Sequence, residues 1–289
     1  MSFVRNLFSK PCALMTGGCV LVLLLAGLGS PARGAEPEYL VSVAVTPDNT
    51  VFLADRNLPG IWTLNDGKLS ILYRGSKKFR TPLNAVRCVT VDRAGQLLAG
   101  DSATREVYRF DESGEPVPLT EGGIGIPMSI GVLSSGDLLV ADLELHRVVR
   151  VPAGGGKPEV FTEVPAPRSL FVDGSDHVWV ISHGPDQLLR IDAEGKVETV
   201  VSGRVWDFPS AIVVGENDMA YVCDTYGKSI WKIEKQQKPA KWVSGGSLKS
   251  PVALALRGNN LLVADPRAKA VFEIDPEGQV APLTWSVDQ

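Results

Sequence analysis

The chain has 289 residues, with 29 basic and 33 acidic side chains and an apolar fraction of 44%, which is ordinary for a globular protein. This composition excludes a disordered or collagen-like chain. Beyond residue 35 there are 26 basic and 33 acidic side chains, a net charge of −7. That balance argues against a nucleic-acid-binding protein, because phosphate neutralisation needs a clustered basic excess.

Residues 1–35 have the features of an export signal. Two basic residues, Arg5 and Lys10, precede an uncharged apolar stretch over 12–28, and small residues follow it. We predict a signal peptide over 1–35, which places the rest of the chain in the periplasm or outside the cell. The alternative interpretation is an uncleaved membrane anchor formed by residues 11–29, because such a stretch is near the lower length limit for crossing a bilayer.

Residues 36–289 contain six copies of a repeat of about 41 residues. The most recognisable segment of each copy is LLVAD or a variant of it. The last residues of these segments are Asp55, Asp101, Asp142, Ser182, Asp224 and Asp265. Successive copies are 46, 41, 40, 42 and 41 residues apart. A regular period of this length indicates a repeat architecture.

Each copy contains four predicted strands. An apolar run of period two precedes the LLVAD segment, and a turn rich in Gly, Asn and Asp joins the two runs, which is typical of a tight hairpin. Two further short runs follow, and in the third run the fourth residue is polar in every copy. The chain is therefore predicted to be all-β, a six-bladed β-propeller over 36–289 with four antiparallel strands per blade.

The first run of each copy is predicted to be the innermost strand. Its second position is small in every copy: Ser42, Cys88, Ser129, Ser169, Ala211 and Ala253. Strands crowd near a propeller axis, so small side chains are expected there. The next position is aliphatic and is expected to pack between blades: Val43, Val89, Ile130, Leu170, Ile212 and Leu254.

The two cysteines beyond the signal segment are expected to stay unbonded. Cys88 and Cys223 lie in blades two and five, on opposite sides of the predicted ring, which is too far for a disulfide. We also expect the last outer strand to end at about Val287. The ring is then predicted to close by packing alone, without a strand contributed by the other terminus.

The sixfold pattern of aliphatic strand, Gly/Asp/Asn turn, LLVAD, short loop and VVRV resembles the NHL-repeat propellers. The resemblance covers almost all of residues 36–289. NHL-like rings include ligand-binding and sensory domains as well as enzymes such as gluconolactonase-like hydrolases. The resemblance therefore implies the fold and leaves the function open.

Gluconolactonase-like enzymes hold a divalent cation above the ring centre with a Glu, an Asn and an Asp, the oxygen ligands that hard cations need. In this chain the residues expected to open the inner strands are Val41, Arg87, Met128, Arg168, Ser210 and Val252. None of the six is acidic. Leu40 occupies the place of the family's Glu, and Glu38 and Asn84 are out of register. We therefore expect no cofactor, with Ca²⁺ or Mg²⁺ only if the chain is an enzyme.

Polar residues at the strand ends have two interpretations. The Asp that recurs in five blades is expected to accept backbone N–H bonds from the following loop. Blade four has Ser182 there instead, followed by His183 and Asp186, while blade three offers Glu144 and His146 on the neighbouring loop. These side chains could act as acid and base, as in a lyase-type propeller. Alternatively, they are solvent-facing loop residues.

Basic and aromatic residues gather on the same predicted face. Arg87 and Arg168 open inner strands near the axis, and Arg267 lies in a loop. Further basic residues of that face are Lys77, Lys78, Arg80, Arg105 and Arg204. In an acidic protein these side chains could attract anions. Trp206, Phe208 and Tyr226 could stack on a sugar or another planar ligand, although Trp206 and Phe208 could equally seal the junction between blades four and five.

We therefore expect an exported NHL-type propeller that acts as a binding or sensing module. Its partner would be a small anionic ligand, a peptide or a protein, held over the top of the central channel. The candidate ligand-binding residues are Arg87, Arg168, His146, His183, Trp206, Tyr226 and Arg267.

The alternative is a metal-assisted hydrolase or lyase. Its candidate catalytic residues would be His146, His183, Glu144 and Asp186. The sequence favours a protein that is not an enzyme and predicts a monomer. It predicts no nucleic-acid partner, and contact with a membrane only through an uncleaved anchor over 11–29.

Overall fold

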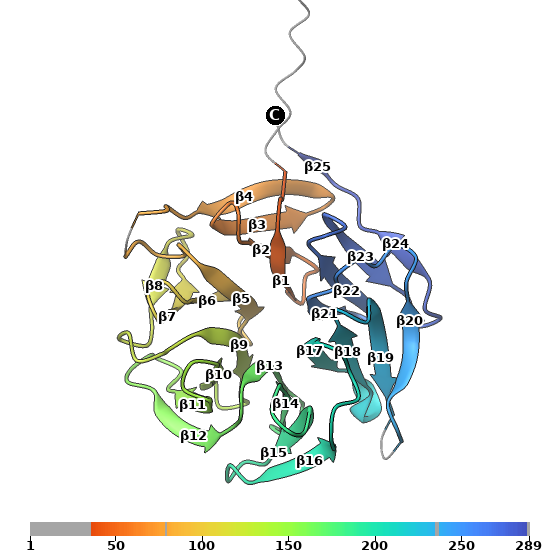
Figure 1. Cartoon of the computed structure of the whole chain (residues 1–289). Coiled ribbons are helices and arrows are strands. Elements are labelled where there is room, and N and C mark those ends of the chain that lie inside the picture. Colours follow the sequence, from red (N-terminus) through yellow and green to blue (C-terminus); the bar gives the residue numbers. More distant parts are fainter. Residues whose placement is uncertain (1–35, 79, 235–236, 288–289) are drawn as a thin grey trace, which may run out of the picture. The chain divides into compact units, whose positions relative to one another are not determined.

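The computed structural model describes residues 36–78, 80–234 and 237–287, and the predicted export signal over 1–35 lies outside them. The described residues form six sheets, each built on four antiparallel strands, arranged around a common axis (Figure 1). This arrangement confirms the prediction of a six-bladed, all-β propeller. No helix in the described residues is long and apolar enough to span a bilayer.

Each blade consists of four consecutive strands, numbered outward from the axis. The innermost strands are β1 (Leu40–Val45), β5 (Val86–Val91), β9 (Pro127–Val132), β13 (Pro167–Val172), β17 (Pro209–Val214) and β21 (Ala253–Arg257). The second strands are β2 (Val51–Asp55), β6 (Leu97–Asp101), β10 (Leu138–Asp142), β14 (Val178–Ser182), β18 (Ala220–Asp224) and β22 (Asn260–Asp265).

The two outer positions of each blade complete the sheets. The third strands are β3 (Gly60–Asn65), β7 (Glu106–Phe110), β11 (Arg147–Val151), β15 (Leu188–Ile191), β19 (Ser229–Ile233) and β23 (Ala270–Ile274). The outermost strands are β4 (Lys68–Arg74), β8 (Pro116–Pro118), β12 (Glu159–Glu163), β16 (Val197–Val201), β20 (Ala240–Ser244) and β24 (Val280–Pro282). A short 3₁₀ turn, η1 (Glu216–Asp218), lies in the connection between β17 and β18.

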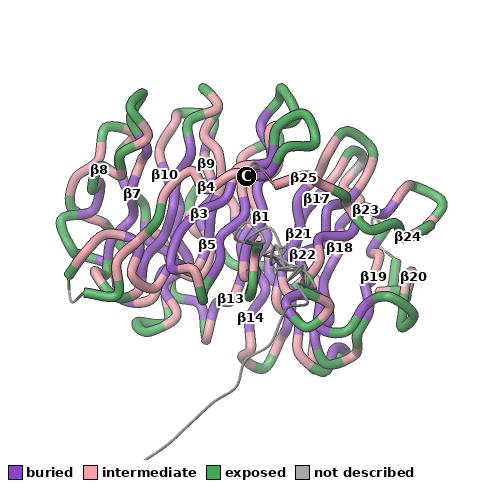
Figure 2. Tube along the Cα trace, turned by 90° about the horizontal axis from the view of Figure 1, so that it is seen from above, coloured by how far each residue is buried: buried purple, intermediate pink, exposed green. Residues whose placement is uncertain are grey.

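The apolar core is divided among the junctions between neighbouring blades. Six clusters of buried side chains occur, each of which combines residues of two adjacent blades. The predicted aliphatic column supplies one residue to each cluster, from Val43 at the junction of blades six and one to Leu254 at the junction of five and six. Figure 2 shows that burial follows the strands, whereas the turns at both faces are exposed. The prediction that this column packs between blades is confirmed.

Small polar side chains of the inner strands link each blade to the next. Ser42 Oγ accepts a hydrogen bond of 3.0 Å from the backbone N–H of Val89, and Ser129 Oγ donates one of 3.1 Å to the backbone oxygen of Leu170. Ser169 Oγ accepts one of 3.2 Å from the N–H of Ile212. The small column therefore both relieves crowding at the axis and satisfies backbone groups on the open edge of the neighbouring strand.

The closure of the ring differs from the prediction. The outermost strand of blade six, β24, ends at Pro282, and Val287 belongs instead to a short strand, β25 (Ser286–Val287). This strand pairs in parallel with β4 of blade one, where the N–H of Ser286 donates a 2.8 Å hydrogen bond to the backbone oxygen of Gly67. The prediction that the ring closes by packing alone is therefore wrong. Two paired residues are too few to leave a readable period of two in the sequence.

Cys88 and Cys223 are both free and buried, as predicted. Burial raises the pKa of the Cys88 thiol to about 12, and its Sγ lies 3.5 Å from the backbone oxygen of Pro127 on the next blade. Cys88 therefore acts as a small spacer of the inner strand and not as a nucleophile.

Candidate functional site

A β-bulge recurs at the start of five inner strands. In β5, for example, Val86 pairs with Asp101 and Cys88 pairs with Gly100, so Arg87 is skipped in the pairing with β6. The residues skipped in this way are Val41, Arg87, Met128, Arg168 and Ser210. Bulges redirect side chains and are frequent next to binding sites. Val252, which immediately precedes β21, occupies the corresponding place in blade six.

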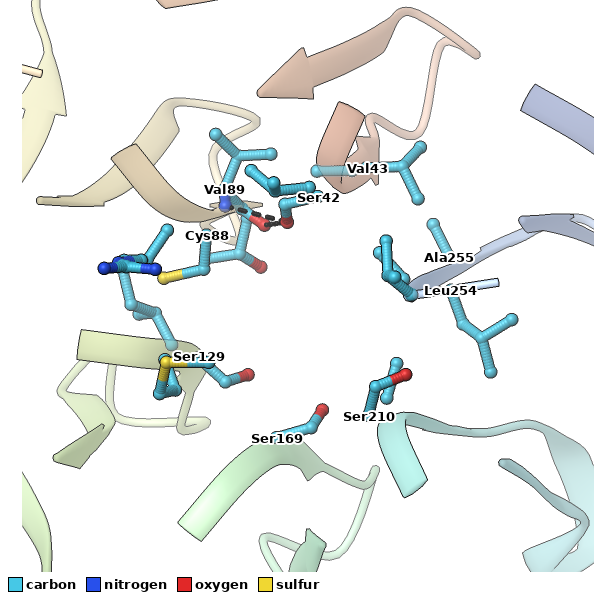
Figure 3. A pocket seen from close by; sticks show the side chains of 18 of the residues that line it. Ser42, Val43, Cys88, Val89, Ser129, Ser169, Ser210, Leu254 and Ala255 are labelled. Atoms are coloured by element: carbon cyan, nitrogen blue, oxygen red, sulfur yellow. Dashed lines mark hydrogen bonds between the residues drawn. The ribbon is translucent and has the colours of Figure 1, made fainter. Parts of the chain in front are cut away.

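These six residues form one end of the central channel, which we call the mouth. All six are half-buried and line a cavity of about 880 Å³ along the axis. The cavity is also lined by residues at the far ends of the inner strands, including Val91 and Val172, so it extends along strands about 20 Å long. Figure 3 shows this space, with the side chains of Ser129, Ser169 and Ser210 directed toward it from three neighbouring blades.

Four arginines line the mouth end of the cavity. Arg87 and Arg168 are the bulged residues of blades two and four, while Arg56 and Arg267 follow the second strands of blades one and six. Nε of Arg87 donates a 2.9 Å hydrogen bond to Oγ of Ser102, which holds the guanidinium in place. Positive charge therefore approaches the mouth from several sides.

The mouth arginines have no acidic counterparts in the cavity wall. Among the described residues that line the cavity, Asp92 is the one acid. It lies beyond the far end of β5, where it accepts N–H bonds within its turn and lies 3.4 Å from Nε of Arg109. No described acidic side chain forms an ion pair with any of the four mouth arginines. The mouth is therefore a concentrated positive site in an acidic protein.

Arg168 lies in surroundings that disfavour its charge. Its guanidinium lies over the ring of Phe208, 5.5 Å from the centroid, and its buried Nε has no hydrogen-bond partner among the described residues. Burial, reinforced by the charge of Arg87, lowers the pKa of Arg168. The surroundings of Arg168 therefore destabilise its positive charge. An anion bound at the mouth would stabilise that charge.

Two further rings contact Phe208 beside Arg168. The Tyr226 ring lies against it, with centroids 4.6 Å apart and an interplanar angle of 30°, and the His183 ring meets it edge-on at 4.5 Å. Phe208 and Tyr226 line the cavity, whereas His183 does not. Nε2 of His183 lies 2.7 Å from the backbone oxygen of Pro209. Burial, with Arg168 and Arg204 nearby, lowers the pKa of His183 and so favours the neutral ring.

The other predicted site residues lie away from the mouth. Glu144 forms an exposed ion pair of 3.1 Å with Nη1 of Arg105, and His146 is exposed in the same turn as Glu144. Asp186 accepts hydrogen bonds from Thr199, Ser202 and Gly203 of its own blade. None of the predicted catalytic residues, Glu144, His146, His183 and Asp186, lines the channel cavity. In the described residues no three His, Cys, Asp or Glu side chains are grouped so that they could hold a metal ion.

Trp206 belongs to a junction between blades. It is 3% exposed, lies in the apolar cluster between blades four and five, and packs edge-on against Trp231. It does not line the channel cavity. The structure therefore supports the alternative interpretation of Trp206, in which it seals this junction and does not face a ligand.

The recurring Asp has the structural role that the sequence predicts. Asp265 is fully buried and accepts N–H bonds from Arg267 and Ala268 in the following loop. It also accepts N–H bonds from Lys249 and Ser250, which precede the inner strand of the same blade. Each such carboxylate therefore ties together the two loops that border the mouth.

Blade four lacks this Asp for a local reason. The residue that precedes its inner strand at the equivalent place is Pro165, which has no N–H to donate. Oγ of Ser182 instead donates a 2.6 Å hydrogen bond to the backbone oxygen of Pro165 and accepts one from the N–H of Gly184. The departure from the repeat therefore preserves the same loop-to-loop connection: the bond to the preceding loop has its donor and acceptor exchanged, and the bond from the following loop keeps its direction.

Some mouth residues were not predicted from the sequence. Arg56 follows Asp55 directly and lies 6.0 Å from the ring centroid of Tyr39, and both side chains line the cavity. The position of Arg56 after a column Asp is a signal that could have identified it. The repeat places Ser210 at the start of an inner strand, whereas the hydroxyl of Thr225, 2.8 Å from that of Ser210, has no comparable signal in the sequence.

Comparison with known proteins places the chain among propellers without assigning it to a family. No family profile matches the chain, and no curated protein matches its sequence. The NHL resemblance therefore stays a prediction.

Solved structures do match the fold. A virginiamycin B lyase from Staphylococcus aureus is 17% identical with a TM-score of 0.66, and the match covers 87% of this chain and 86% of that one. A gluconolactonase from Xanthomonas campestris is 12% identical with a TM-score of 0.69, over 83% and 86%. A chain of a nidogen/laminin complex is 16% identical with a TM-score of 0.64, over 82% and 89%. At these identities the likeness shows the fold alone, and it includes enzymes as well as a binding protein.

Proposed function

We propose that this chain is an exported binding or sensing module that holds a small anionic ligand at the mouth of its channel. The observation that carries the proposal is the set of four arginines at the mouth without an acidic partner in the cavity wall. Arginine presents several donors in a rigid fork that suits carboxylate and phosphate groups. A cavity of about 880 Å³ is of the size that small-molecule sites have.

The bulges support a binding role for Arg87 and Arg168 in particular. In a regular strand, alternate side chains point to opposite faces of the sheet. The bulge removes Arg87 and Arg168 from the pairing with the second strand, which frees them to face the channel. Arg168 is also held without an acceptor for its buried Nε, so its place in the fold contributes little to stability.

The test is the binding of two simple anions, inorganic phosphate and citrate, to the purified full chain by isothermal titration calorimetry at low salt. The double variant Arg87→Ala/Arg168→Ala should lose at least tenfold in affinity, because each charge-assisted bond contributes about 1.5–3 kcal/mol. Affinity for wild type should also fall as salt is added, since exposed charges are screened.

The matched control is Arg190→Ala. Arg190 lies on β15, where it pairs with Glu198 and covers Trp179, and it does not line the channel cavity. This variant should bind both anions like wild type. Equal affinities in wild type and in the double variant would refute the proposed function.

An enzyme is the second candidate, supported by the likeness of the fold to a lyase and a gluconolactonase. In that case His146 and His183, with Glu144 and Asp186, would carry the chemistry. Metal analysis of the purified protein tests this candidate. A stoichiometric divalent ion that is lost in the variant His146→Ala/His183→Ala would favour the enzyme over the binding module.

Export is part of the first proposal and depends on residues 1–35. Cell fractionation with and without these residues tests it. The chain should leave the cytoplasm only when residues 1–35 are present. A cleaved signal should shorten the mature protein by about 35 residues, whereas an uncleaved anchor over 11–29 should retain the full length in the membrane fraction.

A further inference from the structure

One aromatic side chain at the mouth is largely exposed to solvent. Tyr226 is 67% exposed, which is the largest value among the exposed large hydrophobic residues that the structure describes. It follows β18 in the loop that borders the mouth, and its side chain lines the cavity. Most tryptophans and tyrosines of the described chain are partly or fully buried. An aromatic ring displayed beside a cavity is typical of a surface that stacks on a ligand.

The orientation of Tyr226 is supported by its neighbours. Its ring lies against Phe208 at a centroid distance of 4.6 Å, and Phe208 is itself held edge-on by His183. Contact with Phe208 covers part of the Tyr226 ring and leaves the remainder open. The Tyr226 ring is therefore held by an aromatic contact while most of its surface stays accessible beside the cavity.

Cationic and hydroxyl groups lie close to this ring. Phe208 contacts both the Tyr226 ring and the Arg168 guanidinium, and all three residues line the same cavity. Oγ of Ser210 is directed into the channel from the adjacent inner strand (Figure 3), and it lies 2.8 Å from Oγ1 of Thr225. The mouth thus combines a flat apolar surface, a cation and hydroxyls within one wall.

On the basis of the proposed function, we infer that the anionic group of the ligand is attached to a flat-faced ring, either aromatic or pyranose. The ring stacks on the open face of Tyr226, and its anionic substituent pairs with the guanidinium groups of Arg168 and Arg87. A flat ring suits this site because stacking on tyrosine requires a planar apolar face, while the neighbouring arginines recognise the anion. A simple anion without a ring would use only part of the site.

The test compares three monoanions at equal ionic strength by isothermal titration calorimetry on the purified full chain. Acetate carries the anionic group alone, benzoate adds an aromatic ring, and glucuronate adds a pyranose. At least one of the two ring compounds should bind at least tenfold more tightly than acetate. The ring compound with the larger gain in affinity over acetate shows whether the ring of the ligand is aromatic or pyranose.

Substitutions of two tyrosines test where the ring of the ligand binds. Tyr226→Ala should remove most of the tenfold advantage and leave acetate affinity unchanged, whereas Tyr226→Phe should keep it. Tyr39→Ala is the matched comparison, because Tyr39 also lines the cavity and lies near Arg56. It should leave the ring advantage intact.

The inference is overturned if benzoate and glucuronate both bind like acetate, or if Tyr39→Ala and not Tyr226→Ala removes the advantage. Each of these results leaves the proposed function standing, provided that Arg87→Ala/Arg168→Ala still weakens all three anions. If instead the double arginine variant binds all three like wild type, the proposed function itself fails.

Discussion

Two columns of residues border the mouth, and they differ in how strictly they repeat. The second strand ends in Asp in five of six blades, and every one of these carboxylates is buried and accepts backbone N–H bonds. The second column stands at the start of the inner strand, at the bulge where there is one, and its members are Val41, Arg87, Met128, Arg168, Ser210 and Val252. One column is nearly uniform, and the other varies in charge, size and polarity.

The difference reflects what each column contacts. A buried carboxylate has to meet N–H donors at fixed places, because an unsatisfied buried polar group is costly. A side chain at a bulge contacts the open channel and is free to vary without loss of a backbone hydrogen bond. The uniform column therefore maintains the fold, and the variable column is where a function specific to this chain can be placed.

The largest effect is expected from breaking the uniform column. Asp265→Ala removes the acceptor for four backbone N–H groups in a fully buried position, and we expect a loss of about 3 kcal/mol in the free energy of unfolding. Urea denaturation measures it. Asp111→Ala is the matched control, because Asp111 also accepts N–H bonds but is exposed, and it should lose less than about 1 kcal/mol.

A smaller loss in the free energy of unfolding should follow when the Asp is introduced in blade four, which lacks it. Ser182→Asp places a carboxylate at a position that is 1% exposed, against the backbone oxygen of Pro165 instead of an N–H. We expect destabilisation of about 2 kcal/mol. Changing Pro165 to Ala in the same chain supplies the missing N–H and should recover part of that loss in urea denaturation. A stability for Ser182→Asp equal to wild type would contradict the structural explanation of blade four.

A substitution in the variable column should weaken ligand binding and leave stability nearly unchanged. Arg168→Met keeps an unbranched chain as long as the Arg side chain up to Nε, and it removes a guanidinium group whose buried Nε lacks a partner and whose charge Arg87 opposes. The melting temperature should stay within about 2 °C of wild type or rise, while affinity for phosphate and citrate falls about tenfold. Thermal denaturation and calorimetry measure the two effects. A fall of more than about 5 °C would assign Arg168 to the maintenance of the fold.

The smallest effect concerns pH. Because the pKa of His183 is lowered in the folded protein, the unfolded chain binds a proton first as pH falls below about 6.5. The contribution of His183 to stability is therefore complete above that pH and is lost as pH falls toward the folded pKa. Between pH 7.5 and 5.0 the melting temperature of wild type should fall by more than that of His183→Gln, whose amide can still donate to Pro209. Parallel curves for the two proteins would contradict this assignment.

Much of the mouth could be predicted from the sequence because the repeat aligns equivalent residues. Arg87, Arg168, Arg267 and Tyr226 were identified in this way, and all four line the cavity. His146, His183 and Trp206 were also on the predicted face, but they do not line the cavity. Alignment of repeats locates a residue along the axis, whereas its distance from the axis depends on loop conformation, which a repeat does not determine.

The closure of the ring is a second feature that the repeat pattern did not predict. Trp285 and Leu283 pack onto the cluster between blades six and one, and this contact positions β25 against β4. The pairing joins residues about 219 positions apart in the chain. Local periodicity carries no information about such a contact.

The sequence by itself determined the number of blades, the order of the strands, the aliphatic column between blades and the role of the recurring Asp. These features depend on local alternation and on a period that is read along the chain. Only the tertiary structure decided which side chains meet at the mouth, because these contacts join residues far apart in the chain. The Arg168 guanidinium of blade four lies over Phe208, which precedes the inner strand of blade five, and Tyr226 lies against Phe208 from the loop after the second strand of that blade.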